Sequence, residues 1–162
     1  MFERILIVVN NSEVEKDIVI QGAVLAEQFH SAVRLVCVID PPTPFSPVNY
    51  PYPVQYEEHV VAEARRELAA LHSQFAADTP VEDVVLTGLP IPEFLAQAKE
   101  WGADLVIVGD DNNNHHSYAR ALFGSTTDAL ERRAPCPVLV VRRKENPLRF
   151  SADTGVACGD RG

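Results

Sequence analysis

The stretch "IVGDDNNNHHSYARALFGSTTDALERRAPCPVLVVRR", from Ile107 to Arg143, contains the signals that decide the fold. It opens with a short apolar run and closes with a helix start at Ser125 followed by a second apolar run, "PVLVVR". Continuous apolar runs of this length are typical of strands buried on both faces of a parallel sheet. The stretch therefore predicts a strand, a polar loop between Gly109 and Gly124, a helix and a second strand.

The same alternation of strands and helices extends over most of the chain. Short apolar runs predict five strands, at residues 4–9, 32–40, 81–88, 103–109 and 137–142. Between them, apolar residues at helical spacing predict helices whose inward faces carry Val14, Ile18, Leu25 and Phe29, then Val61, Ala64, Leu68, Leu71 and Phe75, then Phe94, Leu95, Ala98 and Trp101. Because crossovers between parallel strands are nearly always right-handed, this order predicts a doubly wound α/β fold.

Local signals mark where three of the helices begin. Ser12 followed by Glu15 forms a capping box, which predicts Ser12 as the N-cap of the first helix. Pro92 suits the first turn of the third helix. Ser125 with Asp128 predicts the start of the last one.

Length and composition favour one domain, at residues 1–143, followed by a tail without periodicity at 144–162. Residues 41–53 hold six of the twelve prolines and three aromatic rings, so neither helix nor strand is expected there. This segment is interpreted either as a lid on its own domain or as a flap over a ligand.

Charge and hydropathy exclude several classes of protein. The net charge of −9 disfavours nucleic acid as a partner. No apolar run reaches the ~20 residues needed to cross a bilayer, and the N-terminus resembles a first strand rather than a signal peptide. We therefore expect a cytoplasmic protein without a membrane segment. Cys37, Cys136 and Cys158 have no spacing typical of a metal site or of a disulfide framework.

Ligands of doubly wound sheets bind at the carboxyl ends of strands, where the strand order reverses, so the loops after Val9, Val38 and Gly109 matter most. Gly124, Ser125 and Thr126 form a helix start whose free N–H groups could hold a phosphate. An ordinary N-cap explains the same residues equally well. Gly109 would allow a close approach of ligand or backbone.

The residues after Gly109 leave further alternatives open. Asp110 and Asp111 are either solvated turn acids or, beside a phosphate, acids that would need Mg²⁺ between. His115 and His116 are adjacent, which disfavours convergence on one metal and suits contacts with an anion. No set of nucleophile, base and acid is visible, so the residues predict no enzyme; a weak ATPase is the enzymatic alternative.

The chain resembles the universal stress protein family, through "ILIVVNNSE", "VRLVCVID" and above all "FGSTTDALERRAPCPVLVVR". The resemblance covers residues 2–143. It implies a five-stranded parallel sheet in the order 3-2-1-4-5 and a homodimer formed by the last strands edge to edge, here Val138, Leu139, Val140 and Val141. Covering an exposed apolar edge strand agrees with the physics of sheets.

Many members of that family bind ATP, and the resemblance implies a nucleotide site at Asn10, Ser12, Val38, Gly109, Asn112, Gly124, Ser125 and Thr126. Two positions depart from the family pattern. Asn112 stands where a middle glycine is usual, and Asn10 stands where an Asp is usual. Asn still donates and accepts hydrogen bonds, but the anionic acceptor is gone. Gly124 lies 15 positions after Gly109, a longer spacing than the family pattern.

Because no catalytic set is visible, two non-enzymatic functions are the main hypotheses. One is a regulatory module that binds ATP or another adenine nucleotide, with or without Mg²⁺, and acts on an unknown protein partner in a stress response. The other is a nucleotide-free homodimer that works as an interaction scaffold. A response-regulator receiver is excluded, because Leu86, Thr87 and Gly88 stand where its phosphoacceptor Asp belongs.

Overall fold

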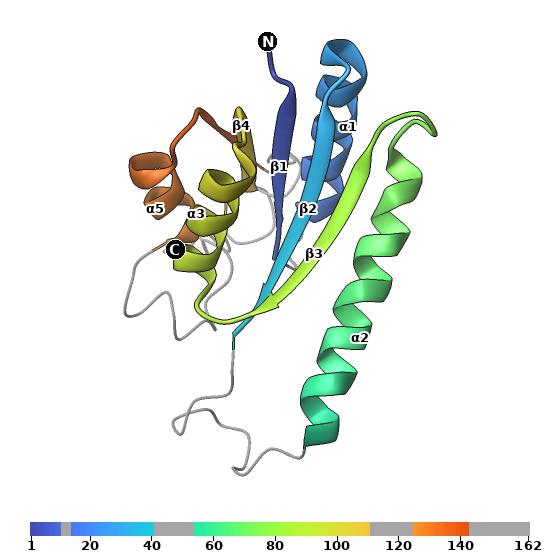
Figure 1. The fold of residues 1–162 in the computed structure, drawn as a ribbon, viewed down its shortest axis with the longest axis vertical. Helices are drawn as coiled ribbons and strands as arrows, with labels where there is room; N and C mark the ends of the chain where they lie inside the picture. The colour runs from blue at the N-terminus through green and yellow to red at the C-terminus, as the bar shows by residue number, and fades with distance from the viewer. Residues whose placement is uncertain (11–13, 41–53, 111–124, 143–162) are drawn as a thin grey trace, which may run out of the picture.

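The computed structural model describes residues 1–10, 14–40, 54–110 and 125–142 and contains a five-stranded parallel sheet (Figure 1). The strand order is β3-β2-β1-β4-β5, as predicted. In chain order the elements are β1 Arg4–Val9, α1 Glu15–Phe29, β2 Ala32–Ile39, α2 Val54–Leu71, a short 3-10 helix η1 His72–Gln74, β3 Val81–Thr87, α3 Pro90–Trp101, β4 Leu105–Gly109, α5 Thr126–Arg133 and β5 Val138–Val141. The predictions for the segment 41–53 and for the tail 144–162 concern residues outside this description.

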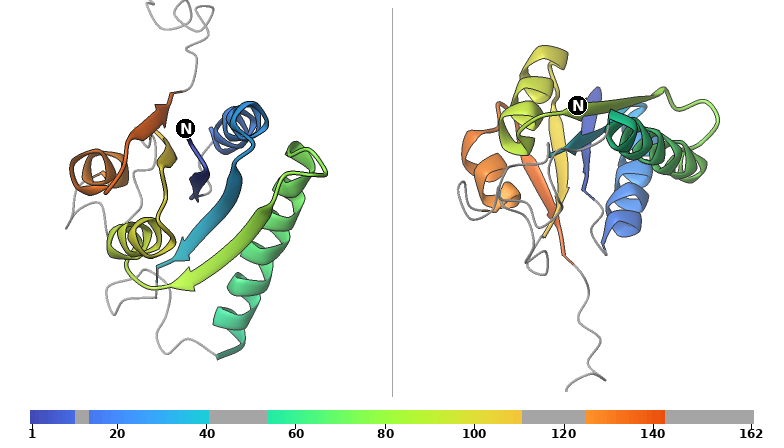
Figure 2. Two further views of the ribbon diagram at one scale, coloured as in Figure 1. Left: turned by 45° about the horizontal axis from the view of Figure 1, so that its top comes forward. Right: turned by 90° about the horizontal axis from the view of Figure 1, so that it is seen from below.

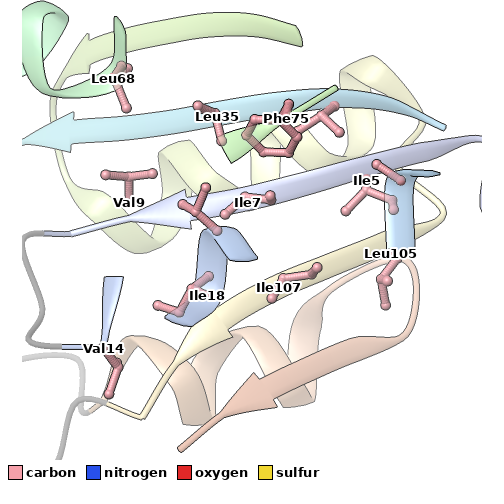
Figure 3. Packing of buried hydrophobic residues seen from close by; sticks show 13 residues of the cluster. Ile5, Ile7, Val9, Val14, Ile18, Leu35, Leu68, Phe75, Leu105 and Ile107 are labelled. Atoms are coloured by element: carbon pink, nitrogen blue, oxygen red, sulfur yellow. The ribbon is translucent and has the colours of Figure 1, made fainter. Parts of the chain in front are cut away.

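The side chains of each strand alternate between two apolar layers. Ile5, Ile7 and Val9 of β1 face the layer that also contains Ile18 of α1 and Leu68 of α2 (Figure 3). The even-numbered residues of β1 face the opposite layer, with residues of α3 and α5. Figure 2 shows α1 and α2 on one side of the sheet and α3 and α5 on the other. Burial on both faces explains why the central strands are continuous apolar runs.

The helices agree with the predicted inward faces except at their edges. Ile18, Ala64, Leu68, Phe75, Phe94 and Ala98 are buried as expected. Leu25, Leu71, Leu95 and Trp101 are only partly buried and pack against the rim of the two layers. Phe29 is largely exposed and meets the ring of Phe2 edge-on at a centroid distance of 5.3 Å.

One helix start corrects the sequence predictions, and two agree with them. The N-cap of α1 is Val14, so the predicted capping box from Ser12 to Glu15 is wrong: Glu15 is the first residue of the helix. A capping box needs the Glu15 carboxylate to accept a hydrogen bond from the N-cap backbone, but Oε1 of Glu15 is buried and accepts none from the described chain. Helix α3 begins at Pro90, so Pro92 lies in its first turn as predicted, and the helix ends on Gly102 in a left-handed conformation (φ 69°). The predicted start of α5 is confirmed, with Ser125 as N-cap.

Arg34 explains how a charged residue fits within the apolar second strand. Its guanidinium carbon lies 4.6 Å from the centre of the Trp101 ring, and its Nη2 lies 2.7 Å from Oε2 of Glu82 on β3. Its Nη1 donates to Oε1 of Gln97 on α3 at 3.1 Å. The side chain thereby connects β2, β3 and α3.

Among the helices of the described ranges, none is long and apolar enough to cross a bilayer.

Gly22 permits the close packing of α1 on the sheet. A Cβ at this position would overlap Cδ1 of Ile7 and would lie 3.3 Å from its Cγ1 and 3.6 Å from Cδ1 of Ile107. Ile7 and Ile107 are both fully buried, so they have little room to move.

We therefore expect Gly22→Ala to lower the free energy of unfolding by about 1–3 kcal/mol, since overpacking outweighs the gain in helix propensity. Ile7→Val removes the overlapping Cδ1 atom. In a double-mutant cycle measured by urea denaturation, the two changes together should cost less than the sum of the single changes. Additive costs would contradict this account of the packing.

Candidate functional site at the carboxyl edge of the sheet

The strand order reverses between β1 and β4, and this is where doubly wound sheets bind ligands (Figure 1). The register pairs Ile5 with Leu105 and Ile7 with Ile107. Continuing this register by three residues places Asn10 level with Asp110. These two residues therefore flank the point of reversal at the carboxyl edge.

Strand alternation decides which layer each site residue faces. Val8, Val38, Val108 and Val140 all belong to the layer of α3 and α5. Asn10 and Asp110, two residues beyond Val8 and Val108, continue on that face. The sheet thus brings Asn10 of the first strand, Val38 of the second and the end of the fourth together on the side where α5 begins. The other predicted site residues, Ser12, Asn112 and Gly124, lie outside the described ranges.

A buried hydrogen bond fixes the start of α5 to the end of β4. The hydroxyl of Thr127 donates to the carbonyl oxygen of Gly109 at 2.8 Å, and Thr127 is only 5% exposed. Ser125 precedes the helix in an extended conformation, and its hydroxyl makes no capping bond to the described chain. The first N–H groups of a helix have no acceptor within the helix and carry a partial positive charge. The arrangement therefore places an electropositive helix start beside Gly109.

The sequence analysis missed Thr127, which is the residue that connects α5 to β4. The available signal was its position three residues before the buried Leu130, which puts both on the inner side of the helix. The capping pattern of Ser125 and Asp128 indicates where the helix begins but not which residue faces the sheet. Thr126, predicted as a phosphate contact, is half-buried at the first helical position.

Asp110 is a paired acid rather than a solvated turn residue. Its backbone N–H donates to the carbonyl of Val141 at 2.9 Å, which extends the ladder between β4 and β5 by one residue. Its Oδ2 lies 3.3 Å from Nε of Arg142, and the side chains are 20% and 77% exposed, respectively. Gly109 pairs with Val141, so Asp110 and Arg142, the next residues of the two strands, lie side by side.

A second group of titratable residues lies on the opposite face and is not part of this site. Burial, with a smaller effect of the nearby carboxylates of Glu15 and Glu67, raises the pKa of the Cys37 thiol to about 11. Burial and then Glu67 also raise the pKa of Glu15. The Cys37 thiol is therefore protonated at neutral pH and a poor nucleophile. Among the residues with a described placement, no three His, Cys, Asp or Glu side chains form a group that could hold a metal ion; His115 and His116 are not among them.

Comparison with known proteins agrees with this geometry. A model described as the universal stress protein family matches residues 1–142. The chain belongs to the universal stress protein family. Within this family it is similar to the stress response protein NhaX of Bacillus subtilis, with 26% identity over 86% of this chain and 98% of that protein.

Solved universal stress proteins share the fold. One in complex with cAMP has a TM-score of 0.62 and 20% identity over 87% of this chain and 97% of its own. Another, from Archaeoglobus fulgidus in complex with dAMP, has a TM-score of 0.56 and 14% identity over 86% of this chain and 97% of its own. The family resemblance and the fold expected from it are both confirmed.

The connection between α5 and β4 can be tested by substitution. Thr127→Val keeps the shape of the side chain but removes the hydroxyl donor, so we expect the free energy of unfolding to fall by about 1–2 kcal/mol. Thr127→Ser keeps the hydroxyl donor, so its free energy of unfolding should fall by less. Thermal and urea denaturation measure both variants. Equal stability of the wild-type protein and Thr127→Val would contradict a structural role for this hydrogen bond.

Proposed function

We propose that this member of the universal stress protein family is a cytoplasmic regulatory module that binds an adenine nucleotide at the carboxyl ends of β1, β2 and β4. Occupancy of the site would then change its contacts with a protein partner in a stress response. The observation that carries the proposal is the helix start of α5, fixed to the end of β4 by Thr127 on the same face as Asn10 and Val38. Two neighbours of the same fold are complexes with cAMP and dAMP, which share an adenine ring, a sugar and one phosphate.

Each end of the site suits a different part of such a ligand. The backbone at Val38 would meet the adenine, and Asn10 would hydrogen-bond the nucleoside with its amide. Gly109 would let a phosphate approach the N–H groups that begin at Ser125 and Thr126. Ser12, Asn112 and Gly124 complete the proposed set. Mg²⁺ would act here only by lowering the charge of the phosphates beside Asp110.

We propose binding without turnover. Asp110, the acid closest to the proposed phosphate position along the chain, is paired with Arg142. The Cys37 thiol is protonated and lies on the other face of the sheet. Phosphate release would measure slow ATP hydrolysis separately from binding.

The direct test is isothermal titration of the full chain with adenosine, AMP, ADP, ATP and GTP, with and without Mg²⁺. We expect adenine ligands to bind and GTP to bind far more weakly. A ligand present at 100 times its Kd should also stabilise the protein by about 2.7 kcal/mol, seen as a higher Tm. No heat and no Tm shift with any adenine ligand at millimolar concentration would overturn the proposal.

A nucleotide-free homodimeric scaffold is the second candidate, and one observation favours it. β5 is the last strand in the order of the described sheet, so one side of its ladder is an edge. Leu139, at its centre, is 37% exposed although it lies in an apolar strand. An exposed apolar edge strand is a template for pairing with a second chain. We propose that Val138, Leu139, Val140 and Val141 pair with the same strand of a second copy.

Leu139→Lys should convert a dimer into a monomer, because a charged side chain in the middle of an edge strand opposes pairing. Val24→Lys is the matched control: Val24 is 48% exposed on α1, away from β5. Light scattering after size exclusion gives the mass of each form with and without nucleotide. A wild-type protein that is monomeric at micromolar concentration would contradict this interface.

A further inference from the structure

Glu15, Glu67 and Cys37 form a group of titratable residues that the proposed function does not use. They come from α1, α2 and β2, on the face of the sheet opposite to the candidate site. We propose that this group makes the start of α1 sensitive to pH: when the pH falls, the Glu15 carboxylate takes up one proton from water, and the first turn of α1 becomes more stable. The inference goes beyond the proposed function and does not depend on nucleotide binding.

The geometry places the Glu15 carboxylate where its charge has no compensating partner. Glu15 is the first residue of α1 and follows Val14, which is 4% exposed and belongs to the same apolar layer as Leu68 of α2. Its Oε1 is buried and accepts no hydrogen bond from the described chain. Burial without a partner disfavours the charged form of a carboxyl group, because water solvates the charge and an apolar layer does not. The carboxyl group is therefore more stable in this layer when it is protonated.

The other titratable groups near Glu15 add to this effect or leave it unchanged. From α2, the carboxylate of Glu67 repels that of Glu15. From β2, the thiol of Cys37 is protonated at neutral pH and carries no charge that could offset either carboxylate. On α1 itself, Lys16 and Asp17 are exposed, so water screens both. The strand β1 contributes apolar side chains to this layer.

The start of the helix opposes proton uptake, but less strongly. The first turn of α1 carries a partial positive charge, which favours a carboxylate at Glu15. Burial, and then the repulsion by Glu67, outweigh this effect and raise the pKa of Glu15 above its ordinary value of 4.5. A group whose pKa is raised by folding contributes stability that is fully present below its unfolded pKa and is lost as the pH rises through its folded pKa. The start of α1 therefore gains stability as the pH falls through the raised pKa towards 4.5.

A pH titration of the full chain, followed by NMR of the side-chain carboxyl carbons, measures the midpoint of Glu15 directly. We expect this midpoint to lie above that of Glu63, an exposed residue one turn before Glu67 on α2. Glu67→Gln should lower the midpoint of Glu15 without restoring its ordinary value, because burial remains. An ordinary midpoint for Glu15 in the wild-type chain would overturn the inference.

Thermal denaturation then relates the proton to the stability of the fold. Glu15→Gln resembles the protonated side chain, so at about pH 7.5 we expect its Tm to exceed that of the wild-type chain by about 2–4 °C. This difference should disappear as the pH approaches 4.5. Asp17→Asn, at an exposed position in the same first turn, is the matched control, and its difference from the wild-type chain should stay constant over this range.

Hydrogen exchange reports on the first turn itself. The amide of Ile18 donates to the carbonyl of Val14 at 2.9 Å, and at about pH 7.5 it should exchange more slowly in Glu15→Gln than in the wild-type chain. A constant Tm difference between these two forms would overturn the inference, because the proton would then have no effect on the fold. Equal exchange at Ile18 would also overturn it, because proton uptake would then not act on the first turn. A raised midpoint, a converging Tm and slower exchange together support it, whatever the titrations with nucleotides show.

Discussion

The bond from the Thr127 hydroxyl to the Gly109 carbonyl is the constraint on which the candidate site depends. β4 ends at Gly109 and α5 begins at Thr126, so the distance between strand end and helix start is not set by the sheet ladder. A buried hydrogen bond is costly to break, because both groups would lose a partner without gaining water. The bond therefore holds the start of α5 against the end of β4, on the face of the sheet that carries Val38 and Asn10.

The two faces of the sheet have different chemistry at their carboxyl edges. On the side of α3 and α5 are the amide of Asn10, the pair of Asp110 and Arg142, and the start of α5. On the side of α1 and α2, burial and then the nearby carboxylate of Glu67 raise the pKa of Glu15, and burial followed by both carboxylates raises the pKa of the Cys37 thiol. The two faces therefore differ in charge at this edge: an ion pair and a helix start lie on one side, and two neighbouring carboxylates lie on the other. The alternation of strand residues decides which face each side chain joins.

The strands and the start of α5 were predictable because buried parallel strands and helix caps are local signals, whereas the order of the strands came from the family resemblance. Sequence reasoning missed the start of α1, where Val14 is the N-cap and Oε1 of Glu15 is buried without a hydrogen-bond partner in the described chain. It also missed Thr127 and the pairing of Asp110 with Arg142, since both depend on register between segments far apart in the chain. Asn112 and Gly124, on which the nucleotide hypothesis partly rested, fall within residues 111–124 and so outside the described ranges. Their roles therefore stay predictions.

The contact between Gly22 and Ile7 has a consequence for how the protein could report an occupied site. With Ile7 and Ile107 fully buried beneath it, α1 has no space to approach the sheet. The layer of α1 acts as a fixed base, since packed interiors resist compression. A mechanical response to a ligand would have to travel through α5 and the edge strand β5, which are short and lie at the margin of the sheet. If a partner protein contacted that margin and a second copy also bound there, recognition and self-association would compete for one edge.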